Sequence, residues 1–199
     1  MSSTELPGQA HTVIIGAGAV GSSVAYHLSE LGAEDIVVLD QGPLPVTGGS
    51  SVHAPGIMFQ TSPSKIQTKT AYYTSRLLSD AGVYDEVGGI EVARSEQRMD
   101  FLQRRVEWAK SYGLPNPTLL SPSEVSDRLP LVDSSEILGG YYSPTDGRVD
   151  GIAAIEWYRE HTNGRFCSHT QVIDLVTDKQ YITRCILDRC NNEVESSCI

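Results

Sequence analysis

The chain has 199 residues, 40% of them apolar, so it can bury a hydrophobic core without the disulfide staples of a small scaffold. Its 15 lysines and arginines against 25 aspartates and glutamates give a net charge of −10, which disfavours binding to nucleic acid or to an anionic membrane. No segment approaches the roughly 20 apolar residues of a membrane span, and the first ten residues lack a signal-peptide pattern. We therefore expect a cytoplasmic protein.

The cysteines and histidines do not have the spacing of a metal site. The four cysteines, Cys167, Cys185, Cys190 and Cys198, all lie late in the chain and form no CxxC pair. His161 and His169 lie nearby, but the ligand spacing of a zinc site is absent. We expect reduced structural thiols and no metal.

After a flexible lead-in over residues 1–10, the segment 11–40 has the pattern of a βαβ unit. Thr12 to Ile15 and Ile36 to Leu39 are apolar, β-branched runs, typical of strands buried on both faces of a parallel sheet. Between them, Val20, Val24, Leu28 and Leu31 have the spacing of one helical stripe, which we expect to face the core.

Residues 41–63 are rich in glycine, proline and serine, which predicts a long ordered loop. A helix is predicted over 64–81, with Ile66, Thr70, Tyr73 and Leu77 on one face. We group 11–88 as a dinucleotide-binding unit.

Residues 89–150 are predicted to begin an inserted α+β domain of the substrate-binding type. Strands are predicted at 89–93 and 137–142, with a helix after Ser95 whose stripe is Met99, Leu102, Val106 and Ala109. The capping box Ser121-Pro122-Ser123-Glu124 opens a shorter helix. Over 151–199 we predict a return to the first domain, with a helix over 152–161 and a β-meander through 172–173, 181–182 and 186–187.

The run from Gly16 to Gly21 is a GxGxxG sequence between the first strand and the helix. Gly16 permits a tight turn, Gly18 lets the backbone approach a pyrophosphate, and Gly21 lets helix and strand pack closely. Asp40 ends the second strand, where a carboxylate accepts hydrogen bonds from ribose hydroxyls. The alternative is that the glycines serve only a strand-helix turn and that Asp40 is a helix cap. NAD and FAD share the half that these residues would bind.

The loop from Gly48 to Gly56, GGSSVHAPG, favours FAD, because its small residues and hydroxyls offer a second contact to an extended dinucleotide. Its histidine, His53, is ambiguous from the residues alone. It is either a hydrogen-bonded surface residue or a reactive one.

The order GAGAVG, VVLDQGPL, GGSSVHAPG and FQTSPSK resembles the dimethylglycine oxidase and sarcosine or dimethylglycine dehydrogenase branch of the FAD-dependent amine oxidoreductases. The resemblance is close over about 11–158 and weaker beyond. It implies a Rossmann-like FAD-binding fold of the α/β class and a covalent bond between His53 and the 8α-methyl of the flavin. It also implies cofactor contacts, which are Ala19 and Val20 at the pyrophosphate, Asp40 and Gln41 at the ribose, Ser50, Ser51, Val52 and Ile57 on the flavin side, and Val172 at the adenine.

The resemblance further implies oxidation of a small N-methyl amino acid such as dimethylglycine or sarcosine, with oxygen or an electron-transfer flavoprotein as acceptor. It allows a mitochondrial matrix location, although no transit peptide is seen. Measured against the family, the chain stops before the substrate-binding residues, so we expect a truncated, inactive form and nominate no catalytic residue. An NAD-dependent dehydrogenase fragment and a non-catalytic FAD-binding protein are the alternatives.

Overall fold

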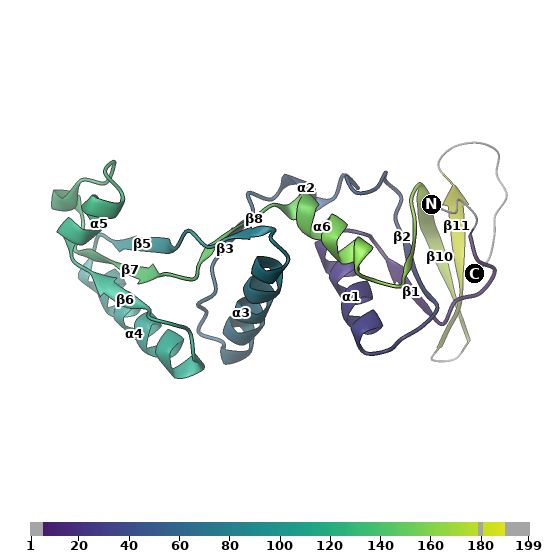
Figure 1. Cartoon of the computed structure of the whole chain (residues 1–199), viewed down its shortest axis with the longest axis horizontal. Coiled ribbons are helices and arrows are strands. Elements are labelled where there is room, and N and C mark those ends of the chain that lie inside the picture. The colour runs from purple at the N-terminus through teal and green to yellow at the C-terminus, as the bar shows by residue number, and fades with distance from the viewer. Residues whose placement is uncertain (1–5, 179–180, 190–199) are drawn as a thin grey trace. The chain divides into compact units, whose positions relative to one another are not determined.

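The computed structural model describes residues 6–178 and 181–189, and these form two compact units (Figure 1). The first unit comprises Met1–Pro55 and Gly151–Ile199, and the second comprises Gly56–Asp150. Of the predicted lead-in, residues 1–5 lie outside the described residues, as do Cys190 and Cys198.

The first unit is built on a parallel sheet in the order β1-β2-β9, formed by Thr12–Ile15, Ile36–Leu39 and Arg165–Cys167. Its helices are α1 (Ala19–Glu30), α2 (Ser50–His53) and α6 (Gly151–Glu160). Strands β10 (Thr170–Asp178) and β11 (Tyr181–Arg189) pair antiparallel. The predicted meander of three short strands is therefore two long strands in this part of the described chain.

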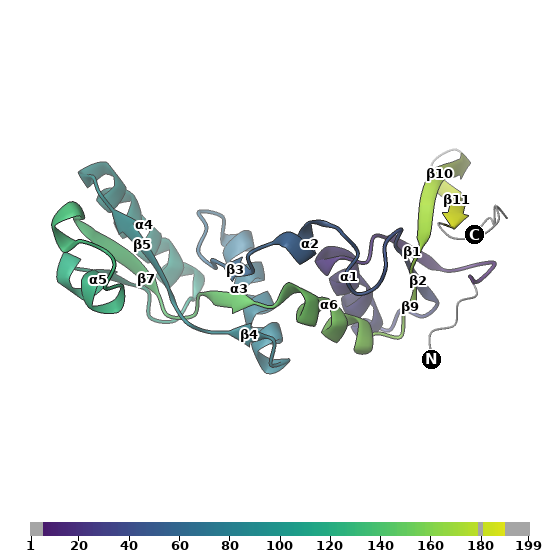
Figure 2. The same cartoon turned by 90° about the horizontal axis from the view of Figure 1, so that it is seen from above.

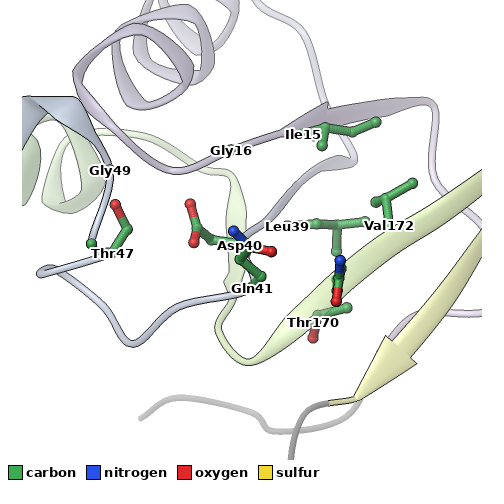
Figure 3. A pocket seen from close by; sticks show the side chains of 11 residues that line it. Ile15, Gly16, Leu39, Asp40, Gln41, Thr47, Gly49, Thr170 and Val172 are labelled. Carbon is green, nitrogen blue, oxygen red and sulfur yellow. The ribbon is translucent and has the colours of Figure 1, made fainter.

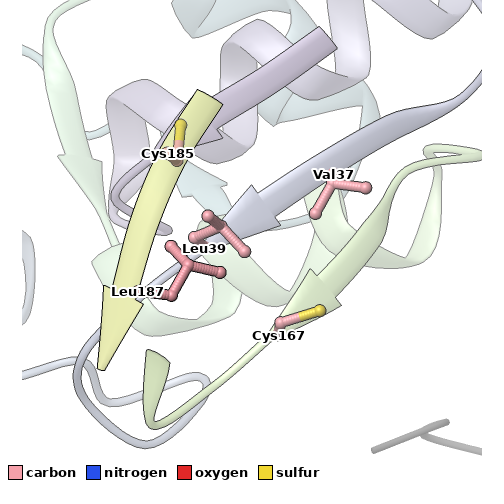
Figure 4. Close-up of a cluster of buried hydrophobic side chains, with 5 residues drawn as sticks. All are labelled: Val37, Leu39, Cys167, Cys185 and Leu187. Atoms are coloured by element: carbon pink, nitrogen blue, oxygen red, sulfur yellow. The ribbon is translucent and has the colours of Figure 1, made fainter. Parts of the chain in front are cut away.

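Strand β2 is buried on both faces, which explains its continuous apolar sequence. Val37 and Leu39 point to one face, where they pack with Cys167 of β9 and with Cys185 and Leu187 of β11 (Figure 4). Ile36 and Val38 point to the other face and pack with Ala17 and Ala25. Because successive strand residues alternate between faces, the β10–β11 hairpin and helix α1 cover opposite sides of the sheet. Cys167 and Cys185 are both buried.

Helix α1 buries only part of its predicted apolar stripe, at Leu28, which packs against the core. Val20 and Leu31 are 79% and 84% exposed, whereas Ser22 and Ala25 are fully buried. The physical reason is the close approach of the helix to the sheet. A Cβ atom at Gly21 would overlap the carbonyl oxygen of Gly16 and lie 3.3 Å from Cγ2 of Ile14, so only small residues fit on this face.

The second unit contains two three-stranded antiparallel sheets (Figures 1 and 2). One has the order β3-β8-β4, formed by Ile57–Met58, Gly147–Val149 and Tyr84–Asp85. The other has the order β5-β7-β6, formed by Gly89–Ala93, Gly139–Ser143 and Thr118–Leu120. The unit begins at Gly56, whereas the sequence pattern groups 56–88 with the dinucleotide-binding unit. The difference arises because β3 and β4 pair with the distant β8.

The helices of the second unit are α3 (Lys65–Asp80), α4 (Glu96–Tyr112), α5 (Pro122–Arg128) and the 3-10 helix η1 (Ser134–Glu136). Helix α4 buries Leu102, Val106 and Ala109, as its stripe predicts, and the capping box of Ser121 and Glu124 is present. Helix α3 departs from expectation. It buries Thr68, Ser75 and Leu78, while Ile66 and Tyr73 are exposed.

Candidate functional site: a pocket at the carboxyl end of the parallel sheet

The glycine-rich turn joins β1 to α1. Gly16 has a φ of +100°, a conformation that residues with a Cβ rarely adopt, and its N–H donates to the carbonyl of Leu39 at 2.7 Å. Gly18 is the N-cap of α1 and has no side chain to satisfy the first N–H groups of the helix. The turn therefore leaves N–H groups and the positive end of the helix dipole at the N-terminus of α1, where an anion is stabilised.

Asp40 is held by backbone groups on both sides. Its two carboxylate oxygens accept hydrogen bonds from the N–H of Ala17 at 2.7 Å and from the N–H of Gly42 at 2.8 Å. The backbone of Asp40 bonds to Cys167 and Thr170, which fixes the residue between β2 and the start of β10. The side chain is 9% exposed, and each oxygen keeps a lone pair for a further donor.

A pocket of about 320 Å³ opens beside Asp40 (Figure 3). It lies in the first unit at the carboxyl ends of β1 and β2, the edge at which open α/β sheets bind ligands. Its lining residues are Ile15, Gly16, Leu39, Asp40, Gln41, Thr47, Gly48, Gly49, Thr170, Gln171 and Val172. Figure 3 shows Asp40 and Gln41 between the glycine turn and strand β10.

Four of the residues predicted from sequence line this pocket: Gly16, Asp40, Gln41 and Val172. Sequence reasoning did not identify Ile15, Leu39, Thr47, Thr170 and Gln171. Thr47 precedes the glycines of the loop and so could have been included. Thr170 and Gln171 carry no motif. They reach the pocket because β10 crosses the end of β2.

Helix α2 meets the N-terminus of α1. The hydroxyl oxygen of Ser51 accepts a hydrogen bond from the N–H of Ala19 at 3.1 Å. A Cβ atom at Gly18 would lie 3.1 Å from the same hydroxyl oxygen, so a side chain there would require Ser51 to shift by a few tenths of an ångström. Ser50 and Val52 belong to this helix, and His53 is its last residue, exposed to solvent. The serine-histidine segment thus begins beside the glycine turn.

Two predicted residues lie elsewhere. Val20 sits on the exposed side of α1 and does not line the pocket. Ile57 belongs to strand β3 of the second unit, where it pairs with Arg148.

The second unit holds a buried polar network around Asp146, which is 2% exposed. The carboxyl of Asp146 accepts the N–H of Gln60 at 3.0 Å, and the Gln60 side chain bonds to Ser75 and Thr145. Burial raises the pKa of Asp146 above its ordinary value. The network ties the segment after β3 to the turn before β8.

The described ranges, 6–178 and 181–189, contain neither a helix suited to crossing a membrane nor a cluster of three or more metal-binding side chains.

Comparison with known proteins places this geometry in a family. Mouse pyruvate dehydrogenase phosphatase regulatory subunit, a mitochondrial protein, is 31% identical over 191 residues, 91% of this chain and 21% of the relative. Human mitochondrial sarcosine dehydrogenase is 32% identical over 156 residues, 74% of this chain and 17% of the relative. Rat mitochondrial dimethylglycine dehydrogenase is 33% identical over 160 residues, 75% of this chain and 18% of the relative.

Among solved structures, L-proline dehydrogenase from P. horikoshii superposes with a TM-score of 0.83 at 21% identity, over 92% of this chain and 50% of that one. This likeness supports the Rossmann-like α/β fold. The chain spans about a fifth of the length of the three curated relatives. The family model described as FAD dependent oxidoreductase matches residues 11–195, and the chain belongs to that family.

Proposed function

We propose that this chain binds FAD, with the adenosine diphosphate half in the pocket beside Asp40. The observation that carries the proposal is the position of the Asp40 carboxylate, which lines the pocket next to the glycine turn and has oxygen lone pairs free for two ribose hydroxyls. A 2'-phosphate on the ribose would be repelled by the same carboxylate.

The residues of the turn fit a pyrophosphate. Gly16 and Gly18 place no side chain between the backbone and a ligand, Gly21 lets α1 pack closely on β1, and the N-terminus of α1, at Ala19 and Val20, supplies N–H donors. Gln41 and Val172 complete the adenosine side of the pocket. The bond from Ala19 to Ser51 is the contact that would be exchanged for a phosphate oxygen.

We propose that His53 is the covalent attachment point of the flavin. It is exposed, and no partner of its ring is found among the residues that the structure describes. It lies two residues after Ser51, on the helix that meets α1. Ser50, Val52 and Ile57 would line the flavin side. Linkage needs a neutral imidazole as nucleophile.

For the whole protein we propose oxidation of a small N-methyl amino acid such as sarcosine or dimethylglycine. When bound, the flavin supplies the chemistry of hydride acceptance from the N-methyl carbon. The described residues bind and orient it. Support for the substrate class comes from two relatives named for sarcosine and dimethylglycine. The electron acceptor would be oxygen or an electron-transfer flavoprotein.

A second candidate is an FAD-binding regulatory protein without turnover. The observation in its favour is the match over 91% of this chain to a relative named as a regulatory subunit. In this case flavin would bind but no amine would reduce it. An NAD-dependent dehydrogenase would give no use to the GGSSVHAPG loop and would lack flavin absorbance near about 450 nm.

The test is acid denaturation of the purified chain. We expect the yellow colour to stay with the polypeptide, and a His53→Ala variant to release it. Colour that washes away from the unaltered chain would overturn the covalent link, and no flavin absorbance at all would overturn FAD binding. Adding sarcosine or dimethylglycine to the longest available form of the protein then separates enzyme from regulator, because bleaching near about 450 nm reports reduction.

A further inference from the structure

The second unit has a groove of about 430 Å³ between helix α3 and the end of α4, a volume in the range of small-molecule sites. It is lined by Thr68, Lys69, Tyr72, Tyr73, Arg76, Tyr112, Gly113 and Leu114. All of these residues belong to one compact unit, so the groove does not depend on the FAD pocket.

One face of α3 forms a wall of the groove. Lys69, Tyr72, Tyr73 and Arg76 have the spacing i, i+3, i+4 and i+7, so they lie together on one side of the helix. Two tyrosine rings stand between the cations, which are about 10 Å apart along the helix axis. The wall is therefore apolar in its middle and positive at its ends.

The opposite wall is fixed by the end of α4. Gly113 adopts a left-handed conformation with a φ of +90°, and the N–H of Leu114 returns to the carbonyl of Ala109 at 2.9 Å. This turn buries Leu114, which is 6% exposed. The hydroxyl of Tyr112 donates to the carbonyl of Pro63 at 3.0 Å, which holds its ring at the groove.

The charged side chains that line the groove are both cations, although the chain carries a net charge of −10. Two cations and no carboxylate line it. The guanidinium of Arg76 is engaged by Glu86 at 3.2 Å and by Asp80 at 3.9 Å. Lys69 has no ion pair within the described ranges, so its ammonium is the group available to a ligand anion.

We propose that this groove binds a small carboxylate with an apolar, preferably aromatic, body. The carboxylate would pair with the ammonium of Lys69, and the body would lie against Tyr72, Tyr73 and Leu114. The cations of the lining favour an anion over a cation as ligand. The phenol rings of Tyr72, Tyr73 and Tyr112 in the groove favour an apolar body over a sugar.

Calorimetric titration with 3-phenylpropionate tests the proposal, with 3-phenylpropan-1-ol and 3-phenylpropylamine as matched neutral and cationic probes. We expect one site with a dissociation constant of about 0.1–1 mM for the acid, weaker binding of the alcohol and none of the amine. Lys69→Gln should weaken the binding of the acid by about threefold to tenfold and leave the binding of the alcohol unchanged. Lys65→Gln, on the same helix but outside the groove, is the matched control.

Tyr73→Ala provides a second variant that separates the apolar contact from the charge. Tyr73 is 52% exposed, so we expect the fold to tolerate the loss of its ring. The variant should weaken the binding of the acid and of the alcohol to the same extent. Saturating FAD should leave acid binding unchanged, which makes failure here distinguishable from failure of the FAD proposal. Equal binding of the three probes, equal effects of Lys69→Gln and Lys65→Gln, or displacement of the acid by FAD would overturn the proposal.

Discussion

Replacing Gly21 by alanine tests the close packing of α1 on β1. The new Cβ atom would overlap the carbonyl oxygen of Gly16, closer than real side chains approach, and would lie 3.0 Å from its carbon. Helix α1 must then retreat by about 1 Å or more, an overpacking that costs about 3 kcal/mol. Alanine is the better helix former by about 1 kcal/mol, so we expect a net loss of about 2 kcal/mol in the free energy of unfolding.

Urea denaturation measures this loss, and ADP titration of the same variant reports the pocket. The control is Gly32→Ala at the other end of α1. Gly32 has a φ of +83°, but a Cβ atom added there would meet no other atom within 4 Å. Backbone strain there should cost about 1 kcal/mol without affecting ADP binding. If Gly21→Ala matched the wild-type stability within about 0.5 kcal/mol and still bound ADP, the close-packing argument would be refuted.

Three further predictions follow from named contacts. Asp40→Asn should weaken ADP binding by at least about tenfold in a binding titration, because the amide nitrogen cannot accept from the ribose or from the N–H of Ala17 or Gly42; undiminished affinity would contradict it. Burial raises the pKa of Asp146 in the folded state, so the wild-type chain loses stability as the pH rises above about 3.9 and the protonated form is lost. Asp146→Asn should therefore gain stability relative to the wild type over this rise in pH. If urea denaturation gave a difference in the free energy of unfolding that did not change with pH, the prediction would be contradicted. Ser121→Ala should cost about 1 kcal/mol in the free energy of unfolding, measured by urea denaturation, because it removes the side-chain oxygen that accepts a hydrogen bond from the N–H of Glu124; an unchanged stability would contradict this.

The local patterns that the sequence predicted well are those where one physical requirement dominates. Strand β2 is continuously apolar because both of its faces are buried, and the glycines at 16 and 21 are required by a positive φ and by helix-strand contact. Ser121 and Glu124 form their box because capping depends on residues three apart.

The sequence predictions differ from the structure where contacts between distant segments decide which residues are buried or line the pocket. The apolar stripe of α1 faces the core only in part, at Leu28. Contact with the sheet selects the small residues Ser22 and Ala25 over Val20 and Leu31. The pocket residues Thr170 and Gln171 could not be found from local pattern, since β10 reaches Asp40 only through tertiary pairing. Long-range pairing also sets the bounds of the compact units, because β3 and β4 find their partner, β8, more than 50 residues later.

The most direct test of the FAD proposal is a titration of the His53→Ala chain, from which bound flavin can be removed. We predict saturable, one-to-one binding of ADP that FAD displaces. Binding of 2'-phospho-ADP should be at least about tenfold weaker because of the Asp40 carboxylate. Absence of ADP binding by the folded chain, or a preference for the 2'-phosphate, would contradict it.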